Sequence, residues 1–140
     1  QMAFDATGFG GLHPSIEPLL TAGVVWNSSV FEGRTSNDQV LLTCMMNEKR
    51  TPGLRIMSEQ EIRTTLIAEI TKNYKITGSP ISISIGVWEH AIPQYNIHMK
   101  YVKEGISSLE SDHIYFLSNW PNGIGLTDCI SNATHLSGSI

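Results

Sequence analysis

Cysteines, charged residues and long hydrophobic runs are all scarce in this sequence. The 140 residues include two cysteines, Cys44 and Cys129. This is neither a disulfide framework nor a zinc pattern, and it fits a reducing compartment. The five histidines lack metal-ligand spacing, so we expect surface or hydrogen-bonded side chains and no metal site. No apolar run reaches the roughly 18 residues that span a membrane.

Clusters of basic residues are also missing. Charged residues make up 16% of the chain, the formal net charge is -4, and hydrophobic residues make up 41%. This composition is globular and excludes a typical nucleic-acid binder. The length predicts one domain with a single core. Gln1-Met2-Ala3-Phe4 is neither an initiator sequence nor a signal peptide, so we expect a chain that begins within a longer one. The scarcity of cysteine favours a cytoplasmic protein.

The first part of the chain predicts an antiparallel meander. Its apolar and β-branched runs are separated by polar turns, which is typical of neighbouring strands. We expect strands over Phe4–Pro14, Ala22–Phe31 and Val40–Met46. Glycines within the first of these runs suggest a bulge or a close approach to another backbone or to a ligand.

The rest of the chain predicts helices and strands in alternation. Ser58 with Glu61 three residues later is a capping box that opens a helix, which ends before Gly78 and Pro80. Beyond it we expect a strand over Ser79–Trp88, a helix over Met99–Leu109, a strand over Ile114–Ser118 and a last helix capped by Thr127 or Asp128. The fold class is therefore α+β (mixed α/β), with a βαβα segment after the meander.

Two glycines, Gly123 and Gly125, lie between the last predicted strand and the last helix. A helix N-terminus offers unpaired N–H groups and partial positive charge to an electron-rich ligand. The competing interpretation is a tight turn. The pattern is not a dinucleotide fingerprint, because Asp128 stands where the third glycine is required.

Four motifs, in order along nearly the whole chain, resemble the protoporphyrinogen oxidase family. They are Gly8–Pro14, Asn27–Arg34, the Trp88–Tyr95 segment with its Ile92-Pro93-Gln94-Tyr95 turn, and Gly123–Ile130. The sequence departs from the family at Glu32, where proline is usual, at Asn47-Glu48 and at His98-Met99. These departures indicate a divergent member.

The resemblance implies the C-terminal part of a two-domain FAD-linked oxidoreductase that oxidises protoporphyrinogen IX or coproporphyrinogen in haem biosynthesis. Residues 1–98 would belong to the substrate domain and residues 99–140 would return to the FAD-binding domain. The family's nucleotide fingerprint is not in this chain, so the N-terminal remainder of the enzyme is the expected partner, and the isolated chain is expected to be inactive. Many members of the family are peripheral to a membrane, which adds a peripheral membrane contact to the expectations.

The resemblance also implies site residues. Positions that match flavin contacts in the family are Val87, Trp88, Ile124, Gly125, Leu126 and Asp128, and those that match the porphyrinogen pocket are Phe9, Leu12 and Met45. For the three pocket residues the alternative interpretation is core packing, and for Trp88 it is a core or interface tryptophan. No catalytic base is assigned. A non-enzymatic α+β binding module and another flavin enzyme of the amine-oxidase type stay open as alternatives.

Overall fold

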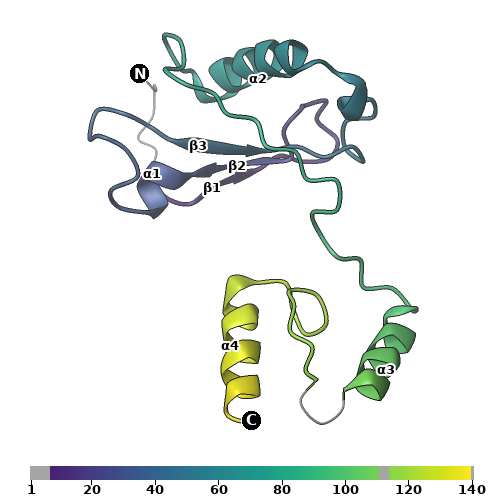
Figure 1. Cartoon of the computed structure of the whole chain (residues 1–140). Helices are drawn as coiled ribbons and strands as arrows, with labels where there is room; N and C mark the ends of the chain where they lie inside the picture. Colours follow the sequence, from purple (N-terminus) through teal and green to yellow (C-terminus); the bar gives the residue numbers. More distant parts are fainter. Residues whose placement is uncertain (1–6, 111–113, 140) are drawn as a thin grey trace. The chain divides into compact units, whose positions relative to one another are not determined.

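The computed structural model describes residues 7–110 and 114–139, and the chain divides into two compact units, up to Ile85 and from Gly86 (Figure 1). Among the described residues, the buried hydrophobic side chains all belong to the first unit: Leu20, Val24, Ile70 and Tyr74. The single core expected from the chain length is therefore a core of the first unit alone. The α+β class is confirmed by an antiparallel sheet accompanied by helices.

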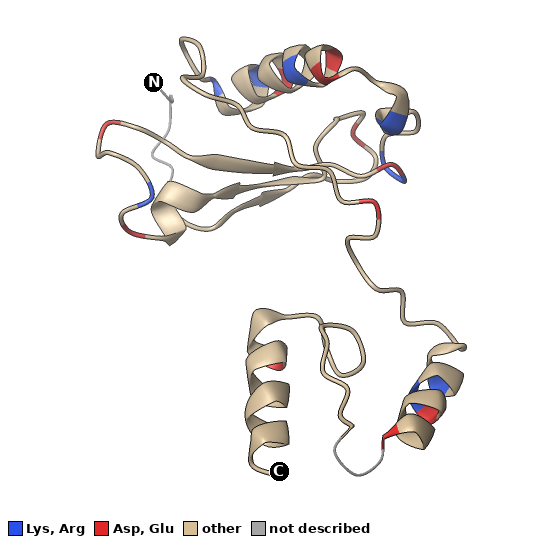
Figure 2. Ribbon diagram, in the orientation of Figure 1, with Lys and Arg blue, Asp and Glu red and all other residues tan. Residues whose placement is uncertain are grey.

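A three-stranded meander forms the sheet of the first unit. Strands β1 (Gly10–Leu12), β2 (Gly23–Trp26) and β3 (Leu42–Met45) pair antiparallel in the order β1-β2-β3, as predicted. Residues 4–6 of the first predicted strand lie outside the described residues. None of the three strands carries a charged residue (Figure 2). The sheet therefore offers apolar and small side chains on both faces.

The second strand is shorter than predicted. The chain forms one helical turn, α1 (Asn27–Val30), directly after Trp26. Short polar side chains compete with the strand ladder for backbone groups. Here the Ser28 hydroxyl accepts a hydrogen bond from the backbone N–H of Leu41 at 3.2 Å, and Phe31 N donates to Asn27 O at 3.0 Å. The strand prediction over residues 27–31 was wrong for this reason.

Helix α2 (Glu59–Tyr74) packs on one face of the sheet, after a short 3-10 turn η1 (Leu54–Ile56). Its capping box is confirmed: Ser58 Oγ accepts from Glu61 N, and Glu61 Oε2 accepts from Ser58 N. Ile70 and Tyr74 of α2 join Val24 in a core cluster that also receives Trp26 and Cys44. Because strand side chains alternate, the helix covers the Val24 and Trp26 face of the sheet.

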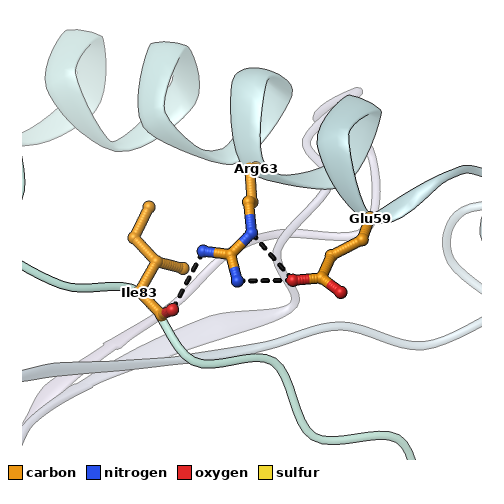
Figure 3. A network of polar contacts seen from close by, with 3 residues as sticks. All are labelled: Glu59, Arg63 and Ile83. Carbon is orange, nitrogen blue, oxygen red and sulfur yellow. Dashed lines mark hydrogen bonds and ion pairs between the residues drawn. The ribbon is translucent and has the colours of Figure 1, made fainter.

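The strand predicted over Ser79–Trp88 does not form. Residues 81–87 are an extended chain without ladder pairing, and Ile81 and Val87 are 84% and 83% exposed. Alternating apolar residues make a strand only where a neighbouring strand supplies backbone partners. Here the Ile83 carbonyl instead accepts a hydrogen bond from Arg63 Nη1 at 2.9 Å, while the Arg63 guanidinium also binds Glu59 (Figure 3).

The second unit contains helices α3 (Met99–Leu109) and α4 (Leu126–Ser137). The bounds of α3 agree with the prediction. The predicted strand over Ile114–Ser118 is reduced to a single bridge at Ile114, and Ile114 to Leu117 are exposed rather than central in a sheet. No residue of α3 or α4 is buried, so these helices present apolar side chains to solvent. None of the described helices is long and apolar enough to cross a membrane.

Candidate functional site

Two of the three predicted pocket residues flank one glycine on the sheet. The register pairs Leu12 with Gly23 and Gly23 with Met45. Since Val24 faces α2, this row of residues lies on the opposite face, which we call the outer face. Strands lie about 4.8 Å apart, so the Leu12 and Met45 backbones stand about 10 Å apart. The fold thus brings together two residues that are widely separated in sequence.

The outer face is apolar and open to solvent within the first unit. Leu12 is 88% exposed and Met45 is 52% exposed, although large apolar side chains usually become buried. Leu12 leans over Gly23, because a Cβ added at Gly23 would lie 2.9 Å from Leu12 Cδ2. Core packing, the competing interpretation for these residues, is therefore not what the structure shows.

Phe9 does not join this row. It directly precedes β1 and its carbonyl accepts a hydrogen bond from Trp26 N at 3.0 Å. Residues two apart on a strand share a face, whereas Phe9 and Leu12 are three apart. Its side chain is 71% exposed, so Phe9 is not a core residue of the first unit either.

The glycine turn before α4 accommodates an aspartate. The N-cap of α4 is Gly125, so the helix begins before Thr127 and Asp128, and the predicted cap position was wrong. Asp128 Oδ2 instead accepts a hydrogen bond from Gly125 N at 3.1 Å, reaching back from the third helical position. Gly123 has a φ of +114°, and a Cβ there would lie 2.5 Å from Asp128 Oδ2. The turn interpretation therefore explains Gly123 without a ligand.

The N-terminus of α4 still presents donors. The N–H groups of the first helical turn have no acceptor within the helix, while Cys129 N already bonds to Gly125 O at 3.0 Å. Ile124 and Leu126 flank this end and are 43% and 77% exposed. The Asp128 carboxylate offsets part of the partial positive charge at the N-terminus of α4. An electron-rich group would therefore bind there mainly through the N–H donors of Leu126 and Thr127.

Val87 and Trp88 lie on the extended segment that precedes α3. They are 83% and 76% exposed, so Trp88 is not a core residue of the second unit. Its indole folds back over the chain, since a Cβ added at Gly86 would lie 2.6 Å from Trp88 Cη2. An exposed aromatic plane over a glycine offers a flat surface for stacking. The structure brings Ile124, Gly125, Leu126 and Asp128 together in one turn but shows no contact between that turn and Trp88.

Sequence reasoning missed a polar network that joins α2 to the sheet. Thr21 is fully buried, and its hydroxyl donates to Glu69 of α2. His13 Nδ1 lies 2.7 Å from Thr21 Oγ1, and His13 Nε2 lies 3.2 Å from the Tyr74 hydroxyl. The resulting chain of groups is carboxylate, hydroxyl, imidazole and phenol. The only signal in the sequence was that these residues can form hydrogen bonds.

The chemistry of this network places a proton on His13 Nδ1. A carboxylate can only accept, so Thr21 gives its single hydroxyl proton to Glu69. The contact at 2.7 Å must then be donated by His13 Nδ1–H. The other ring nitrogen, Nε2, pairs with the Tyr74 hydroxyl at 3.2 Å. His13 is therefore a hydrogen-bonded structural histidine, as the sequence predicted for the class.

Cys44 lies beside this network, facing α2. Burial, and then the Glu69 carboxylate, raise the pKa of the Cys44 thiol from 9.0 to about 11. Between these pH values the unfolded chain loses a proton that the folded chain retains, so we expect the free energy of unfolding to fall as the pH rises. Urea denaturation across this range measures the fall.

The control for this prediction is Cys44→Ala, which removes the titrating thiol. Burial, Cys44 and Glu69 also raise the pKa of Tyr74, so a shallower decline should remain in this variant. An unchanged slope in Cys44→Ala would show that other groups cause the alkaline loss of stability.

One shallow hollow, between α3 and the segment before α4, is lined by none of the predicted site residues. It is lined by Lys103, Ile106, Ser107, Glu110, Phe116, Pro121 and Asn122. Within residues 7–110 and 114–139, no group of three or more His, Cys, Asp or Glu side chains is arranged to hold a metal ion. The outer face of the first unit and the α4 turn of the second unit thus stay the candidate sites.

Comparison with known proteins confirms the resemblance drawn from the motifs. The chain is 27% identical over 136 residues to the chloroplastic protoporphyrinogen oxidase of Oryza sativa subsp. japonica, and the aligned region covers 92% of this chain. It is 28% identical over 135 residues to protoporphyrinogen oxidase 1, chloroplastic, of Arabidopsis thaliana, again covering 92%. It is 23% identical over 133 residues to the coproporphyrinogen III oxidase of Bacillus subtilis (strain 168), covering 93%.

These relatives are much longer than the chain. The match covers 25% of the rice and Arabidopsis proteins and 28% of the Bacillus protein, so the chain spans about a quarter of the length of its relatives. No family model matches the chain. The similarity is therefore continuous along this chain and concerns one part of the longer proteins.

Proposed function

We propose that this chain, which is similar over nine-tenths of its length to proto- and coproporphyrinogen oxidases, is the C-terminal part of an FAD-dependent porphyrinogen oxidase. The substrate is protoporphyrinogen IX or coproporphyrinogen, and the product is the corresponding porphyrin of haem biosynthesis. The remaining part of the enzyme supplies the nucleotide-binding half of the flavin site. The isolated chain is inactive on this proposal.

The observation that carries the proposal is the row of Leu12, Gly23 and Met45 on the outer face. Two residues with exposed apolar side chains have their backbones about 10 Å apart with a glycine between them, on strands that bear no charge. A large macrocycle with an apolar body requires a wall of this kind. The row follows from strand pairing, independently of the similarity to known oxidases, and the resemblance implies pocket positions at both of its apolar residues.

The α4 turn is the proposed flavin contact. Its residues fit the edge of an isoalloxazine ring in two respects: the first-turn N–H groups can donate to a carbonyl, and the exposed Ile124 and Leu126 can pack against the ring. Bound FAD would supply the hydride acceptor for the oxidation. The space over Gly123 and Gly125 is filled by Asp128, so these glycines serve the turn while the donors and Trp88 serve the cofactor.

We expect this chain to restore oxidase activity when it replaces the matching quarter of the Bacillus coproporphyrinogen III oxidase. The chimera is purified, its bound flavin is measured by absorbance, and porphyrin formation is followed by fluorescence. The 140-residue chain with FAD alone should give no porphyrin above the rate of air oxidation. A flavin-loaded chimera that oxidises neither porphyrinogen would overturn the proposal.

A matched pair of variants locates the substrate wall in the chimera. Leu12 and Ile16 are equally exposed apolar residues, at 88% and 89%, but only Leu12 lies on the outer face. Leu12→Glu places a charge against an apolar substrate and should raise KM about tenfold or more, since a buried unpaired charge costs at least one to two kcal/mol. Ile16→Glu should leave KM within about twofold.

A further inference from the structure

The connection between β1 and β2, residues 13–22, is held at its first half by one arginine. Arg50 Nη1 donates to His13 O at 2.8 Å, and Nη2 donates to Pro14 O at 2.7 Å. The same guanidinium reaches Glu17 O at 3.2 Å and, just beyond the first half, Leu19 O at 3.4 Å. A planar guanidinium can serve several carbonyls at once, which a lysine ammonium cannot reproduce. Arg50 therefore sets the path of this half of the connection.

The second half of the connection is held by the carboxylate of Glu69 on α2. Its Oε2 accepts from Leu20 N, and its Oε1 accepts from Thr21 N at 3.1 Å and from the Thr21 hydroxyl. Thr21 is 0% exposed and Leu20 is 5% exposed. Buried N–H groups that lose their acceptor are costly, so the carboxylate is required at this place. A cation thus binds the carbonyls of the first half, and an anion binds the N–H groups of the second.

Both ends of the connection lead directly into the outer-face row. Leu12 immediately precedes His13, and Gly23 follows Thr21 after one residue. The ladder continues across these ends, because His13 N donates to Ala22 O at 3.0 Å and Ala22 N donates to Met45 O at 2.7 Å. A shift of residues 13–22 is therefore passed to Leu12 on one side and to Met45 on the other.

We propose that Arg50 and Glu69 are positioning residues that fix the spacing of Leu12 and Met45 across Gly23. The inference rests on the proposed function, because the row matters as a substrate wall. Neither side chain forms a hydrogen bond with the row itself: Arg50 acts through the carbonyls of the connection and Glu69 through its N–H groups. The apolar wall is thus set by two charges that lie outside it.

The test uses the full 140-residue chain with ¹³C-labelled methionine and leucine methyl groups. Arg50→Lys keeps the positive charge but loses the planar guanidinium that binds several carbonyls at once. Glu69→Gln keeps the shape of the side chain but replaces one acceptor oxygen with an NH2 group. Each should move the Leu12 and Met45 methyl resonances in the free protein and weaken binding of the probe, protoporphyrin IX, by about tenfold, since charge-assisted hydrogen bonds are lost. Helix content by circular dichroism should stay unchanged.

Glu61→Gln is the matched control. Glu61 also accepts from a backbone N–H group, that of Ser58 at 2.7 Å, but at the N-terminus of α2, outside both the connection and the row. This variant should leave the Leu12 and Met45 methyl resonances in place and keep the affinity within about twofold.

The outcomes separate the inference from the function beneath it. If the wild-type Met45 methyl does not respond to protoporphyrin IX, the substrate wall itself is wrong. If the wild type responds, but Arg50→Lys and Glu69→Gln keep its methyl positions and its affinity, the positioning role is overturned while the proposed function stands. Movement of the same resonances in Glu61→Gln would also overturn it, because the loss of any carboxylate contact to the backbone would then suffice.

Discussion

Gly10→Ala should lower the free energy of unfolding of the first unit by at least about 3 kcal/mol and release β1 from the sheet. Gly10 has a φ of +139°, a region that residues with a side chain essentially do not occupy. A Cβ at this position would also lie 2.1 Å from the Val24 carbonyl oxygen and 2.9 Å from Val25 Cα. These are backbone atoms of the paired strand, so relief requires that β1 and β2 move apart.

The neighbouring glycine provides the control for this prediction. Gly11→Ala adds the same methyl group one residue further along β1, where the nearest atom is the Tyr74 hydroxyl oxygen at 3.8 Å, an ordinary van der Waals distance. Urea denaturation compares the two variants, and hydrogen exchange of the amide of His13, which donates to Ala22 O at 3.0 Å, reports on the pairing of β1 with β2. Equal stabilities for Gly10→Ala and Gly11→Ala would contradict the argument from the close approach of the strands.

Gly10→Ala should also affect the proposed function. Leu12 reaches the outer face only because β1 pairs with β2 in the observed register. Once β1 is released, Leu12 no longer stands opposite Met45, and the proposed wall loses one of its two apolar sides. The Gly-rich segment that suggested a close approach in the sequence thus serves the pairing of strands, and through it the candidate site.

The elements predicted well are those specified by neighbouring residues. The Ser58–Glu61 capping box depends on residues three apart, and the bounds of α3 agree with its local pattern. The meander was also predictable, because consecutive strands joined by turns usually pair. Local chemistry was sufficient in each of these cases.

The elements predicted wrongly depend on partners that local pattern does not contain. Residues 79–88 alternate as a strand would, but alternation states which face is apolar, not whether another strand is present. The Arg63 side chain takes the Ile83 carbonyl instead. The run from Ile114 to Leu117 is as apolar as a central strand, yet it has no pairing beyond a bridge at Ile114.

The same distinction between local and long-range information applies to the candidate site. Leu12 and Met45 could be named from the resemblance, but their position across Gly23 required the register. The positioning residues could not be found in advance, since Arg50 and Glu69 bind backbone groups more than 30 residues away in sequence. Backbone carbonyls and N–H groups occur at every position, so no side-chain motif marks such contacts. The network of His13 and Thr21 was hidden for the same reason.

Tyr74→Ala should cost about 3 to 5 kcal/mol, the usual loss for a large aromatic side chain removed from a core. Tyr74 is 9% exposed and joins Val24 and Ile70 in the core cluster. Its ring also meets the Trp26 ring edge-on, with centroids 6.3 Å apart and an interplanar angle of 86°. The described core has so few buried side chains that loss of this one leaves little to hold α2 against the sheet.

Tyr74→Phe separates the ring from its hydroxyl. It keeps the packing but removes the hydroxyl that pairs with His13 Nε2, so it should cost about 1 kcal/mol, the net worth of one hydrogen bond. Urea denaturation followed by circular dichroism measures both variants. If the two substitutions cost the same, the hydroxyl and not the ring would hold α2 in place. The larger cost expected for Tyr74→Ala also has a functional consequence, because α2 carries Glu69. Once the helix detaches, the Glu69 carboxylate no longer binds Thr21. The spacing of Leu12 and Met45 is then lost together with the core.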